Sequence, residues 1–325
     1  MILKFTFYII KVSYIEGVKE MKTLKIGTGA LKGSEISLGC MRLAGHTVEE
    51  VAQLIGKAYE LGIDFYDHAD IYGQGESEKI FAKALKTLPI ERENLILQTK
   101  CGIRPGFFDF SKEHIIQSVE GSLKRLETDY VDVLLLHRPD TLMEPEEVAE
   151  AFNTLYDQGK VKYFGVSNQN PMQMALLNKY LDHKIMINQL QLSITNTTMI
   201  DAGFNVNMEN AAAVNRDGSV LEYCRLHDIT IQAWSPFQYG FFEGVFLDNP
   251  KFPELNAVLD RMAKEKGVTN SALAVAWILR HPAKIQTIVG TTNKERLAAI
   301  CQASDIVLSR QEWYEIYRAA GNILP

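Results

Sequence analysis

The stretch GIDFYDHADIYGQGESEKIFAKAL, residues 62–85, decides how this sequence folds. It begins with a short apolar run, IDFYD at 63–67, continues through a polar segment and ends in the polar start of a helix. A buried strand followed by a helix is the unit of a parallel sheet, because a parallel neighbour needs a long crossover connection. If the unit recurs, the fold is a parallel sheet covered by helices.

Short apolar runs of the same kind recur along the chain. Counting from Glu35 there are eight: EISLGC (35–40), IDFYD (63–67), NLILQTK (94–100), VDVLLLH (131–137), KYFGVS (162–167), MINQLQL (186–192), ITIQAWS (229–235) and IQTIVGT (285–291). Helical patterns separate them. The clearest is HTVEEVAQLIGKAYELG at 46–62, in which Thr47 and Glu50 have the spacing of a capping box and Gly62 ends the helix.

Eight strand–helix units predict an α/β fold, specifically a closed (β/α)8 TIM barrel. A Rossmann domain would carry G-x-G-x-x-G after its first strand, whereas this chain has GCMRLAG at 39–45. The segment KTLKIGTGALKGSEISL at 22–38 predicts an N-terminal β-hairpin that plugs the amino-terminal end of the barrel. RQEWYEIYRAAG at 310–321 predicts an additional C-terminal helix.

Composition and charge exclude several classes of function. The 325 residues are 46% hydrophobic with a net charge of −6, which is typical of globular proteins and argues against a nucleic-acid-binding surface. The four cysteines are widely spaced without a C-x-x-C pair, so we expect no metal knuckle, no disulfide framework and a cytoplasmic location. No segment has the length of a membrane span, so we expect no membrane partner.

Residues 1–20 do not continue the repeating pattern. We interpret them as an N-terminal extension of uncertain order, which reflects either an upstream start codon or a floppy lead. A strand or helix that packs on the barrel exterior is the alternative. Residues 21–325 are then the barrel itself.

The polar residues at the predicted strand ends are the candidate site, because TIM barrels perform their chemistry at the carboxyl ends of their strands. A lysine ammonium about 4 Å from a tyrosine favours the tyrosinate by roughly 4 kcal/mol at an effective dielectric of 20, on the order of 3 pK units. We therefore expect Lys100 to lower the pKa of Tyr72, Asp67 to hold Lys100 charged, and His137 to orient a substrate oxygen. The result is a general acid for hydride reduction of a carbonyl. Further polar residues expected at this rim are Ser167, Asn168, Gln189, Gln191, Trp234, Ser235, Gly290, Thr291 and Thr292.

Five segments, GIDFYDHADIYGQGESEKIFAKAL, LQTKCG, VDVLLLHRPD, GKVKYFGVSN and INQLQ, closely resemble the aldo-keto reductase superfamily, and the resemblance covers about residues 22 to 320. The spacing of Asp67, Tyr72, Lys100 and His137 follows the catalytic tetrad of that family. The resemblance implies an oxidoreductase that reduces small aldehydes or ketones with NADPH, bound without a Rossmann fold. Tyr72 would be the acid, and His68 and Asp70 would be bystanders or substrate-loop residues.

The resemblance also implies cofactor contacts by position. Three side chains resemble the trio that binds the nicotinamide carboxamide: Ser167, Asn168 and Gln189. Trp234 stands where the family usually has a tyrosine or phenylalanine stacked on that ring. The loop SPFQYGFF, with Ser235, Pro236 and Phe237, resembles the pyrophosphate bridge. VGTTNKERL, with Gly290, Thr291, Thr292, Asn293 and Arg296, resembles the adenosine phosphate site. Gly39, Cys40, Met41 and Asp67 match the rim beneath the nicotinamide. Several relatives have a lysine at the position of Asn293, so NADPH is expected and NADH is left open.

Three other functions stay open at this point. A metallohydrolase could use Asp67, His68, Asp70 and His137 as ligands, although its usual His-x-His is missing from the first strand. A Schiff-base aldolase could use Lys100, although Asp67 would keep the amine charged. The third alternative is a cofactor-binding regulatory or redox-sensing barrel with little turnover.

The substrate pocket is expected to be open and suited to small aldehydes or ketones. Phe107, Phe108 and Phe110 would form an apolar wall, and an insertion at 195–220 would cover the site. A long carboxyl-terminal lid is not expected, because the chain ends soon after its last helical pattern. The oligomeric state is not readable from the sequence.

Overall fold

The computed structural model describes residues 21–325, so the prediction for residues 1–20 lies outside the described part of the chain. Eight parallel strands close into a barrel in the order β10-β11-β14-β3-β4-β5-β8-β9. Each overlaps one of the eight apolar runs, and the predicted TIM barrel is confirmed. The strands are β3 (Ile36–Gly39), β4 (Phe65–Asp67), β5 (Ile96–Cys101), β8 (Val131–Leu136), β9 (Val161–Ser167), β10 (Ile185–Gln191), β11 (Thr230–Trp234) and β14 (Gln286–Val289).

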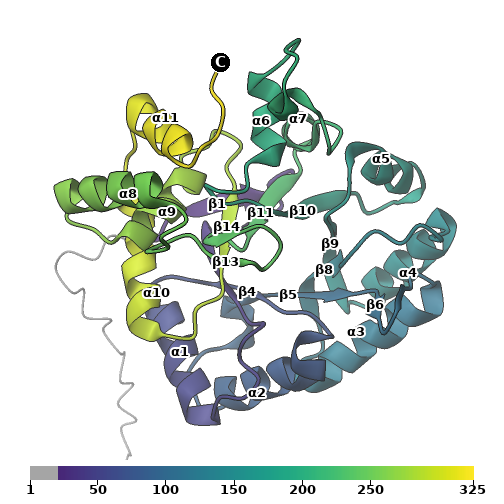
Figure 1. Ribbon diagram of the computed structural model, residues 1–325. Coiled ribbons are helices and arrows are strands. Elements are labelled where there is room, and N and C mark those ends of the chain that lie inside the picture. The colour runs from purple at the N-terminus through teal and green to yellow at the C-terminus, as the bar shows by residue number, and fades with distance from the viewer. Residues whose placement is uncertain (1–20) are drawn as a thin grey trace, which may run out of the picture.

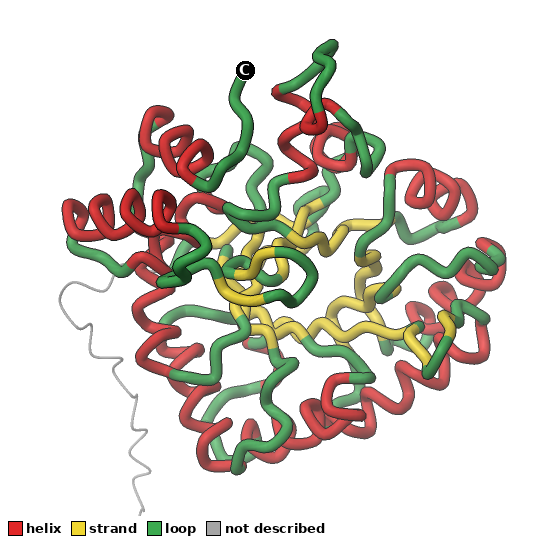
Figure 2. Tube along the Cα trace, viewed as in Figure 1, coloured by secondary structure: helices red, strands yellow, loops and turns green. Residues whose placement is uncertain are grey.

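Helices surround the barrel (Figures 1 and 2). In chain order they are α1 (Val48–Glu60), α2 (Glu76–Leu85), α3 (Lys112–Leu126), α4 (Pro145–Asp157), α5 (Pro171–Tyr180), α6 (Thr198–Phe204), α7 (Val220–Leu226), α8 (Pro253–Lys266), α9 (Asn270–Leu279), α10 (Lys294–Cys301) and α11 (Arg310–Ala319). Short 3-10 turns lie at η1 (Tyr72–Gly75), η2 (Arg92–Asn94), η3 (Ala211–Ala213) and η4 (Gln302–Asp305). Two small antiparallel pairs are β6 (Ile103–Arg104) with β7 (Phe107–Phe108), and β12 (Gln238–Tyr239) with β13 (Gly244–Val245).

Helix α1 shows why the sequence pattern and the structure agree. The Thr47 hydroxyl accepts from the backbone N–H of Glu50, and the Glu50 carboxylate accepts from the backbone N–H of Thr47, so the predicted capping box is present. Gly62 follows the helix with a φ of +81°, a left-handed conformation that glycine adopts without steric cost.

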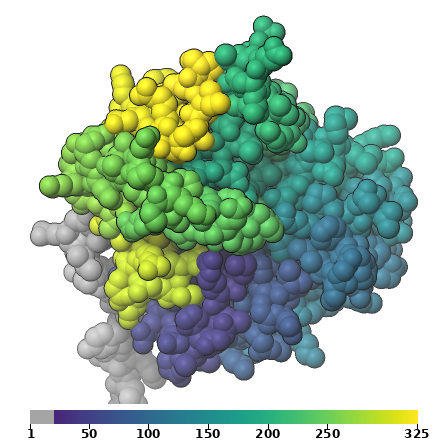
Figure 3. Space-filling view, viewed as in Figure 1, coloured from purple at the N-terminus to yellow at the C-terminus, as the bar shows by residue number. Residues whose placement is uncertain are grey.

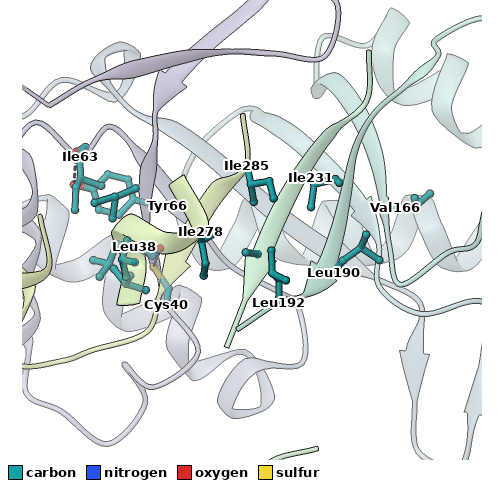
Figure 4. Packing of buried hydrophobic residues seen from close by; sticks show 14 of the residues in the cluster. Leu38, Cys40, Ile63, Tyr66, Val166, Leu190, Leu192, Ile231, Ile278 and Ile285 are labelled. Atoms are coloured by element: carbon teal, nitrogen blue, oxygen red, sulfur yellow. Dashed lines mark hydrogen bonds between the residues drawn. The ribbon is translucent and has the colours of Figure 1, made fainter. Parts of the chain in front are cut away.

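The main apolar core lies between the strands and the helices around them. Figure 4 shows part of it, in which Leu38, Tyr66 and Ile278 come from different elements and belong to one apolar cluster. Removing such side chains from water is the main favourable contribution to folding. The barrel strands are apolar on this outer face and on much of the inner face, which is why their sequences read as continuous apolar runs.

The N-terminal hairpin closes the amino-terminal end of the barrel, as predicted. It pairs β1 (Thr23–Ile26) with β2 (Leu31–Ser34) in an antiparallel register. Ile26 packs in a second apolar cluster with residues from the first halves of the barrel strands, among them Phe65 and Ile96. The hairpin backbone is also tied to the barrel, since Gly27 donates to the Thr230 hydroxyl at 2.8 Å.

The predicted C-terminal helix is α11, and it packs against α9. Trp313 of α11 stacks on Trp277 of α9 with ring centroids 4.6 Å apart. Tyr317 of α11 donates to the Asp201 carboxylate at 2.7 Å, which joins α11 to the 195–220 segment. Among the described residues, no helix has both the length and the apolar character needed to cross a membrane. The cytoplasmic location expected from the cysteines stays a prediction.

Candidate active site

A cavity of about 670 Å³ opens at the carboxyl ends of the barrel strands. Residues that follow β3, β4, β8, β9, β11 and β14 line it. The β12–β13 segment lies over the middle of this face in Figures 1 and 3, drawn in green beside the purple segment that follows β3. The cavity therefore lies at the end of the barrel where TIM barrels perform their chemistry, which is the end predicted from the sequence for the candidate site.

Lys100 is the centre of the polar cluster beneath the cavity. Its ammonium donates to the Asp67 carboxylate at 2.8 Å, to the His68 carbonyl at 2.8 Å and to the Tyr72 hydroxyl at 3.0 Å. These three contacts use all three N–H donors of the ammonium. Lys100 is fully buried and Asp67 nearly so, so the pair interacts in a medium that screens charge weakly.

Tyr72 and His137 bring two polar groups to the cavity wall. Both line the cavity, and their rings meet edge to face with centroids 5.9 Å apart. The His137 Nδ1 atom is buried and has no hydrogen-bond partner in the described residues. Burial, with the charges of Lys100 and Arg138, holds the pKa of His137 well below its usual value, so the imidazole is neutral.

Our expectation that Lys100 lowers the pKa of Tyr72 was wrong. Burial of the hydroxyl raises this pKa above 10, and the attraction of Lys100, although it is the largest opposing effect, does not reverse the shift. The sequence argument counted the lysine and omitted the loss of water around the phenol. The pKa of Lys100 is also raised: burial lowers it, but Asp67 and Tyr72 together outweigh burial. Tyr72 is therefore a neutral phenol beside a stable cation.

A chain of glutamine amides supports Asp67 from inside the barrel. Gln98 and Gln189 each donate to the same Asp67 oxygen, at 2.6 and 3.0 Å, and each also donates to the Gln232 amide oxygen, at 2.9 and 3.0 Å. Gln232 in turn donates to Gln286 at 2.8 Å. The Gln98 to Gln232 bond crosses the barrel interior, because β5 and β11 lie on opposite sides of the closed sheet.

Four of the residues expected around the nicotinamide lie together on one wall, namely Ser167, Asn168, Gln189 and Trp234. Ser167 donates to the Gln189 carbonyl at 3.1 Å, Asn168 donates to the Ser167 hydroxyl at 2.7 Å, and the Trp234 indole donates to the Asn168 amide oxygen at 3.4 Å. Asn168 and Ser235 have φ of +57° and +53°, and such backbone strain is often found at functional sites. Expected residues of this part that line the cavity are Gly39, Met41, Asp67, Ser167, Asn168, Gln189, Trp234, Ser235, Pro236 and Phe237.

The residues expected around the adenosine phosphates follow β14 and begin α10. The Asn293 side chain accepts from the backbone N–H of Arg296 at 2.6 Å, so Asn293 is the N-cap of α10. The guanidinium of Arg42 donates to the Gly290 carbonyl at 2.9 Å. A helix amino terminus beside two guanidinium groups suits a phosphate. Expected residues here that line the cavity are Gly290, Thr291, Thr292, Asn293 and Arg296.

Three of the expected rim residues lie elsewhere. Cys40 is fully buried in the apolar core (Figure 4), with its backbone N–H bonded to the Asp67 carbonyl at 2.9 Å. Lys100 lies behind Asp67 and Tyr72, away from the cavity surface. Gln191 donates to the Gly240 carbonyl at 2.7 Å and so holds the turn between β12 and β13.

The expected apolar wall was assigned to the wrong residues. Phe107 and Phe108 are about half exposed on the β6–β7 pair, and Phe110 is buried against Gly102. None of the three lines the cavity, whose apolar residues are instead Met41, Ile71, Ile103, Trp234, Pro236, Phe237, Phe242, Val245 and Ile288. The 195–220 segment was also wrongly expected over the site. It packs beside α11, whereas the segment after β11 reaches over the cavity.

Sequence reasoning missed Arg42, Arg138 and the glutamine chain. Arg42 lies inside the GCMRLAG segment, and Arg138 follows His137 directly, so both stood next to predicted residues. One sequence signal could have identified the glutamine chain: Gln98, Gln232 and Gln286 are each a polar residue inside an otherwise apolar run. That signal marks a residue that faces the barrel interior and needs a hydrogen-bond partner there.

The remaining polar neighbours disfavour the competing functions. His68 is fully buried, lies edge-on against Phe81 with ring centroids 4.5 Å apart, and has no polar partner in the described chain for either ring nitrogen. Over residues 21–325, no three His, Cys, Asp or Glu side chains are grouped to hold a metal ion. Lys100 is held charged by Asp67, which opposes its use as a Schiff-base nucleophile.

Comparisons with known proteins agree with this geometry. A model of the Aldo/keto reductase family matches residues 35–320. The chain belongs to this family. It is 39% identical over 303 residues to "Uncharacterized oxidoreductase YcsN" of Bacillus subtilis, covering 89% of this chain and 95% of the relative. It is 36% identical over 270 residues to "6-dehydroglucose reductase" of Agrobacterium fabrum, covering 80% and 84%.

A solved structure with the same fold is the thermostable aldo-keto reductase Tm1743, in complex with the inhibitor epalrestat. It superposes with a TM-score of 0.75 at 26% identity, over 92% of this chain and all of the other. The chain is therefore an NAD(P)-dependent oxidoreductase of the aldo/keto reductase family, and its general reaction is carbonyl reduction.

The site fits a nicotinamide dinucleotide. The open cavity combines an indole face, a wall of amides and hydroxyls, and a helix amino terminus with arginines at the far end. An aromatic face, amide partners and cationic groups are what a ring, a carboxamide and phosphates each require.

Proposed function

We propose that this chain reduces aldehydes or ketones to alcohols with NADPH, reversibly, and that Tyr72 is the general acid. The 3.0 Å contact between Lys100 and the Tyr72 hydroxyl supports this most directly, because it joins the phenol at the cavity wall to a buried cation. Family membership fixes the general reaction but leaves the identity of the acid open.

The raised pKa of Tyr72 suits an acid. The phenol keeps its proton at neutral pH and can donate it to the carbonyl oxygen as negative charge develops there. The phenolate left behind lies beside Lys100, whose charge stabilises it, and Asp67 holds that ammonium in place. In the reverse direction the same phenolate accepts the proton of an alcohol.

His137 would orient the substrate. A neutral imidazole carries one N–H. Because the Nδ1 atom of His137 is buried, its Nε2 atom would carry this N–H and donate it to the carbonyl oxygen. The bound reduced nicotinamide supplies the hydride that goes to the carbonyl carbon.

Cofactor binding is assigned by position along the cavity. Ser167, Asn168 and Gln189 would hold the carboxamide, and Trp234 would stack on the ring. The segment Ser235–Phe237 would bridge the pyrophosphate. Residues 290–293 and Arg296 would hold the adenosine phosphates, together with Arg42. Two guanidinium groups favour NADPH over NADH, since the additional 2′-phosphate gains charge-assisted hydrogen bonds.

The experiment compares wild type with Tyr72→Phe by the loss of NADPH absorbance over a panel of small aldehydes. We expect kcat to fall by about 10²- to 10⁴-fold while NADPH still binds, because the phenyl ring fills the same space without a proton. Tyr163→Phe is the matched control. Its hydroxyl bonds to the Ala30 carbonyl of the hairpin, at the opposite end of the barrel, and its kcat should not change.

Two outcomes would contradict the proposal. An active Tyr72→Phe enzyme would show that another group supplies the proton. A wild-type protein that binds NADPH tightly and reduces none of the panel would favour the regulatory or redox-sensing barrel.

A further inference from the structure

Arg138 is a cavity residue with an unusual set of neighbours. It follows His137 at the end of β8, is half-buried and lines the cavity. Its guanidinium lies over two aromatic rings, 5.7 Å from the centroid of Trp234 and 5.6 Å from that of Phe241. No hydrogen bond or ion pair joins Arg138 to another residue in the described part of the chain.

Other half-buried arginines in this structure have carboxylate partners. Arg92 bonds to Asp132 at 2.9 Å, and Arg125 bonds to Glu78 at 2.6 Å. Taking a cation out of water is costly unless an anion compensates it. Arg138 has lost part of its hydration, and burial accordingly lowers its pKa. Two ring contacts compensate only in part, since neither ring carries a negative charge.

The cavity does not supply the missing anion. Asp67 is the carboxylate among the described lining residues, and its oxygens already accept from Lys100, Gln98 and Gln189. A negative charge for Arg138 must therefore arrive with a bound molecule.

The adenosine phosphates are on the wrong side to be that charge. Their proposed site follows β14, and β14 lies opposite β8 in the closed barrel, with three strands between them in each direction. The pyrophosphate, assigned to Ser235–Phe237 beside Trp234, is the competing anion, and the KM for NADPH in Arg138→Met distinguishes it from a substrate anion. The nicotinamide end of a cofactor carries no anionic group. Arg138 instead adjoins His137, the residue proposed to orient the carbonyl oxygen. Its anion would belong to the substrate.

We propose that Arg138 binds an acid group of the substrate, so that the preferred substrates are aldehydes or ketones carrying a carboxylate. This inference rests on the proposed function and names its substrate class. The planar guanidinium presents paired N–H donors that match the two oxygens of a carboxylate, and the rings of Trp234 and Phe241 lie next to it. A phosphate shares this chemistry and is the second probe.

The test compares 4-oxobutanoate with its methyl ester, which has the same chain without the charge. Wild type should show a kcat/KM at least tenfold higher for the acid. Arg138→Met should lower that value by about 10- to 100-fold, as expected for a hydrogen bond to a charged group, and leave the ester within about threefold. Arg138→Lys should restore part of the loss. Arg104→Gln, at an exposed arginine outside the cavity lining, is the matched control, and it should leave the kcat/KM for both substrates unchanged.

The same comparison of kcat/KM is made for a phosphate with glyceraldehyde 3-phosphate and glyceraldehyde. A preference for the phosphate alone, lost in Arg138→Met, would replace the carboxylate with a phosphate as the recognised group and overturn the stated class. If Arg138→Met lost the same factor in kcat/KM for the acid and for the ester, Arg138 would have a structural role only. A rise in the KM for NADPH alone would assign it to the cofactor.

Binding without turnover separates this inference from the proposed function. Butyrate binding to the protein with NADP⁺ is measured by calorimetry for wild type and Arg138→Met. Arg138-dependent binding without carbonyl reduction would keep the acid site and end the reductase proposal. Turnover of neutral aldehydes that depends on Tyr72, without Arg138-dependent butyrate binding, would keep the reductase and end the acid site.

Discussion

The amide oxygen of Gln232 is joined to the carboxylate of Asp67 by two hydrogen-bonded routes through the barrel interior. One route runs through Gln98 of β5 and the other through Gln189 of β10. In each route, the side-chain NH₂ group of one glutamine donates both to the Asp67 carboxylate and to the Gln232 amide oxygen. Gln232 therefore fixes which end of each amide faces Asp67, and the two routes hold the carboxylate that anchors Lys100.

Replacing Gln232 should reduce catalysis from a distance. Gln232→Met removes the oxygen that orients both amides, and we expect kcat to fall about 5- to 50-fold with a smaller change in the KM for the carbonyl substrate. Leaving buried amides without a partner should also lower the free energy of unfolding by about 1–3 kcal/mol. Steady-state kinetics and urea unfolding measure the two effects.

Gln286→Met is the control for that experiment. Gln286 accepts from Gln232 but, among the described residues, has no hydrogen bond to Gln98 or Gln189, so its loss should affect stability more than kcat. A Gln232→Met enzyme with reduced stability and unchanged kcat would show that the network is structural only.

The pH profile of reduction should be flat around neutrality. The active form carries a protonated Tyr72, and because the pKa of Tyr72 is raised above 10, activity should fall only at pH values above the ordinary tyrosine range. On the acid side, His137 is held neutral, since its pKa is well below 6.5, so its protonation should not reduce activity near pH 6.5.

Lys100→Met tests the same assignment. Removing the cation removes the main stabilisation of the phenolate, and we expect kcat to fall by about 10²-fold or more. The profile is measured as kcat against pH for wild type and variant. A wild-type alkaline limb well below pH 10 would contradict the raised pKa of Tyr72.

Asp70 should make stability depend on pH. Burial, with the nearby charge of Glu78, raises the pKa of Asp70 from 3.8 to about 6. Because the folded-state value exceeds the unfolded one, the stabilising contribution is present below about pH 4 and is lost as pH rises through about 6. Above that range the ionised carboxylate destabilises the folded protein, and one of its oxygens is buried without a partner in the described chain.

Asp70→Asn should therefore raise the free energy of unfolding at pH 8 by about 1–3 kcal/mol and change it little at pH 4. Urea unfolding at pH 4, 6 and 8 measures the difference. Glu209→Gln, at an exposed carboxylate, should show no such dependence. An equal effect of Asp70→Asn at all three pH values would exclude titration as its cause.

Trp313 should be the main anchor of α11. Trp313 and Trp277 stack nearly parallel, and each indole N–H donates to the other residue's carbonyl, at 2.9 and 3.1 Å. Trp313→Ala should lower the free energy of unfolding by about 3–5 kcal/mol. Chemical unfolding measures this, with the exposed Val307→Ala as control. The KM for NADPH should not change, because Trp313 does not line the cavity. A loss below about 1 kcal/mol would contradict the anchoring role.

Much of this protein followed from the sequence alone. Eight apolar runs separated by amphipathic patterns determined the barrel, and capping residues such as Thr47 and Glu50 determined where a helix begins, because both depend on residues close together in the chain. The proximity of Asp67, Tyr72, Lys100 and His137 and most of the cavity lining followed from positions at or just after strand ends, since all carboxyl ends of a parallel barrel meet at one rim.

Tertiary structure alone decided the properties that depend on burial and on contacts between distant strands. The pKa of Tyr72 rises because packing removes water from the hydroxyl, and no spacing along the chain records that loss. The glutamine chain joins opposite strands, and the fold places two aromatic rings beside Arg138 and, within residues 21–325, no carboxylate that pairs with it. Local sequence determines elements and their ends, whereas desolvation and pairing across the barrel are properties of the assembled core.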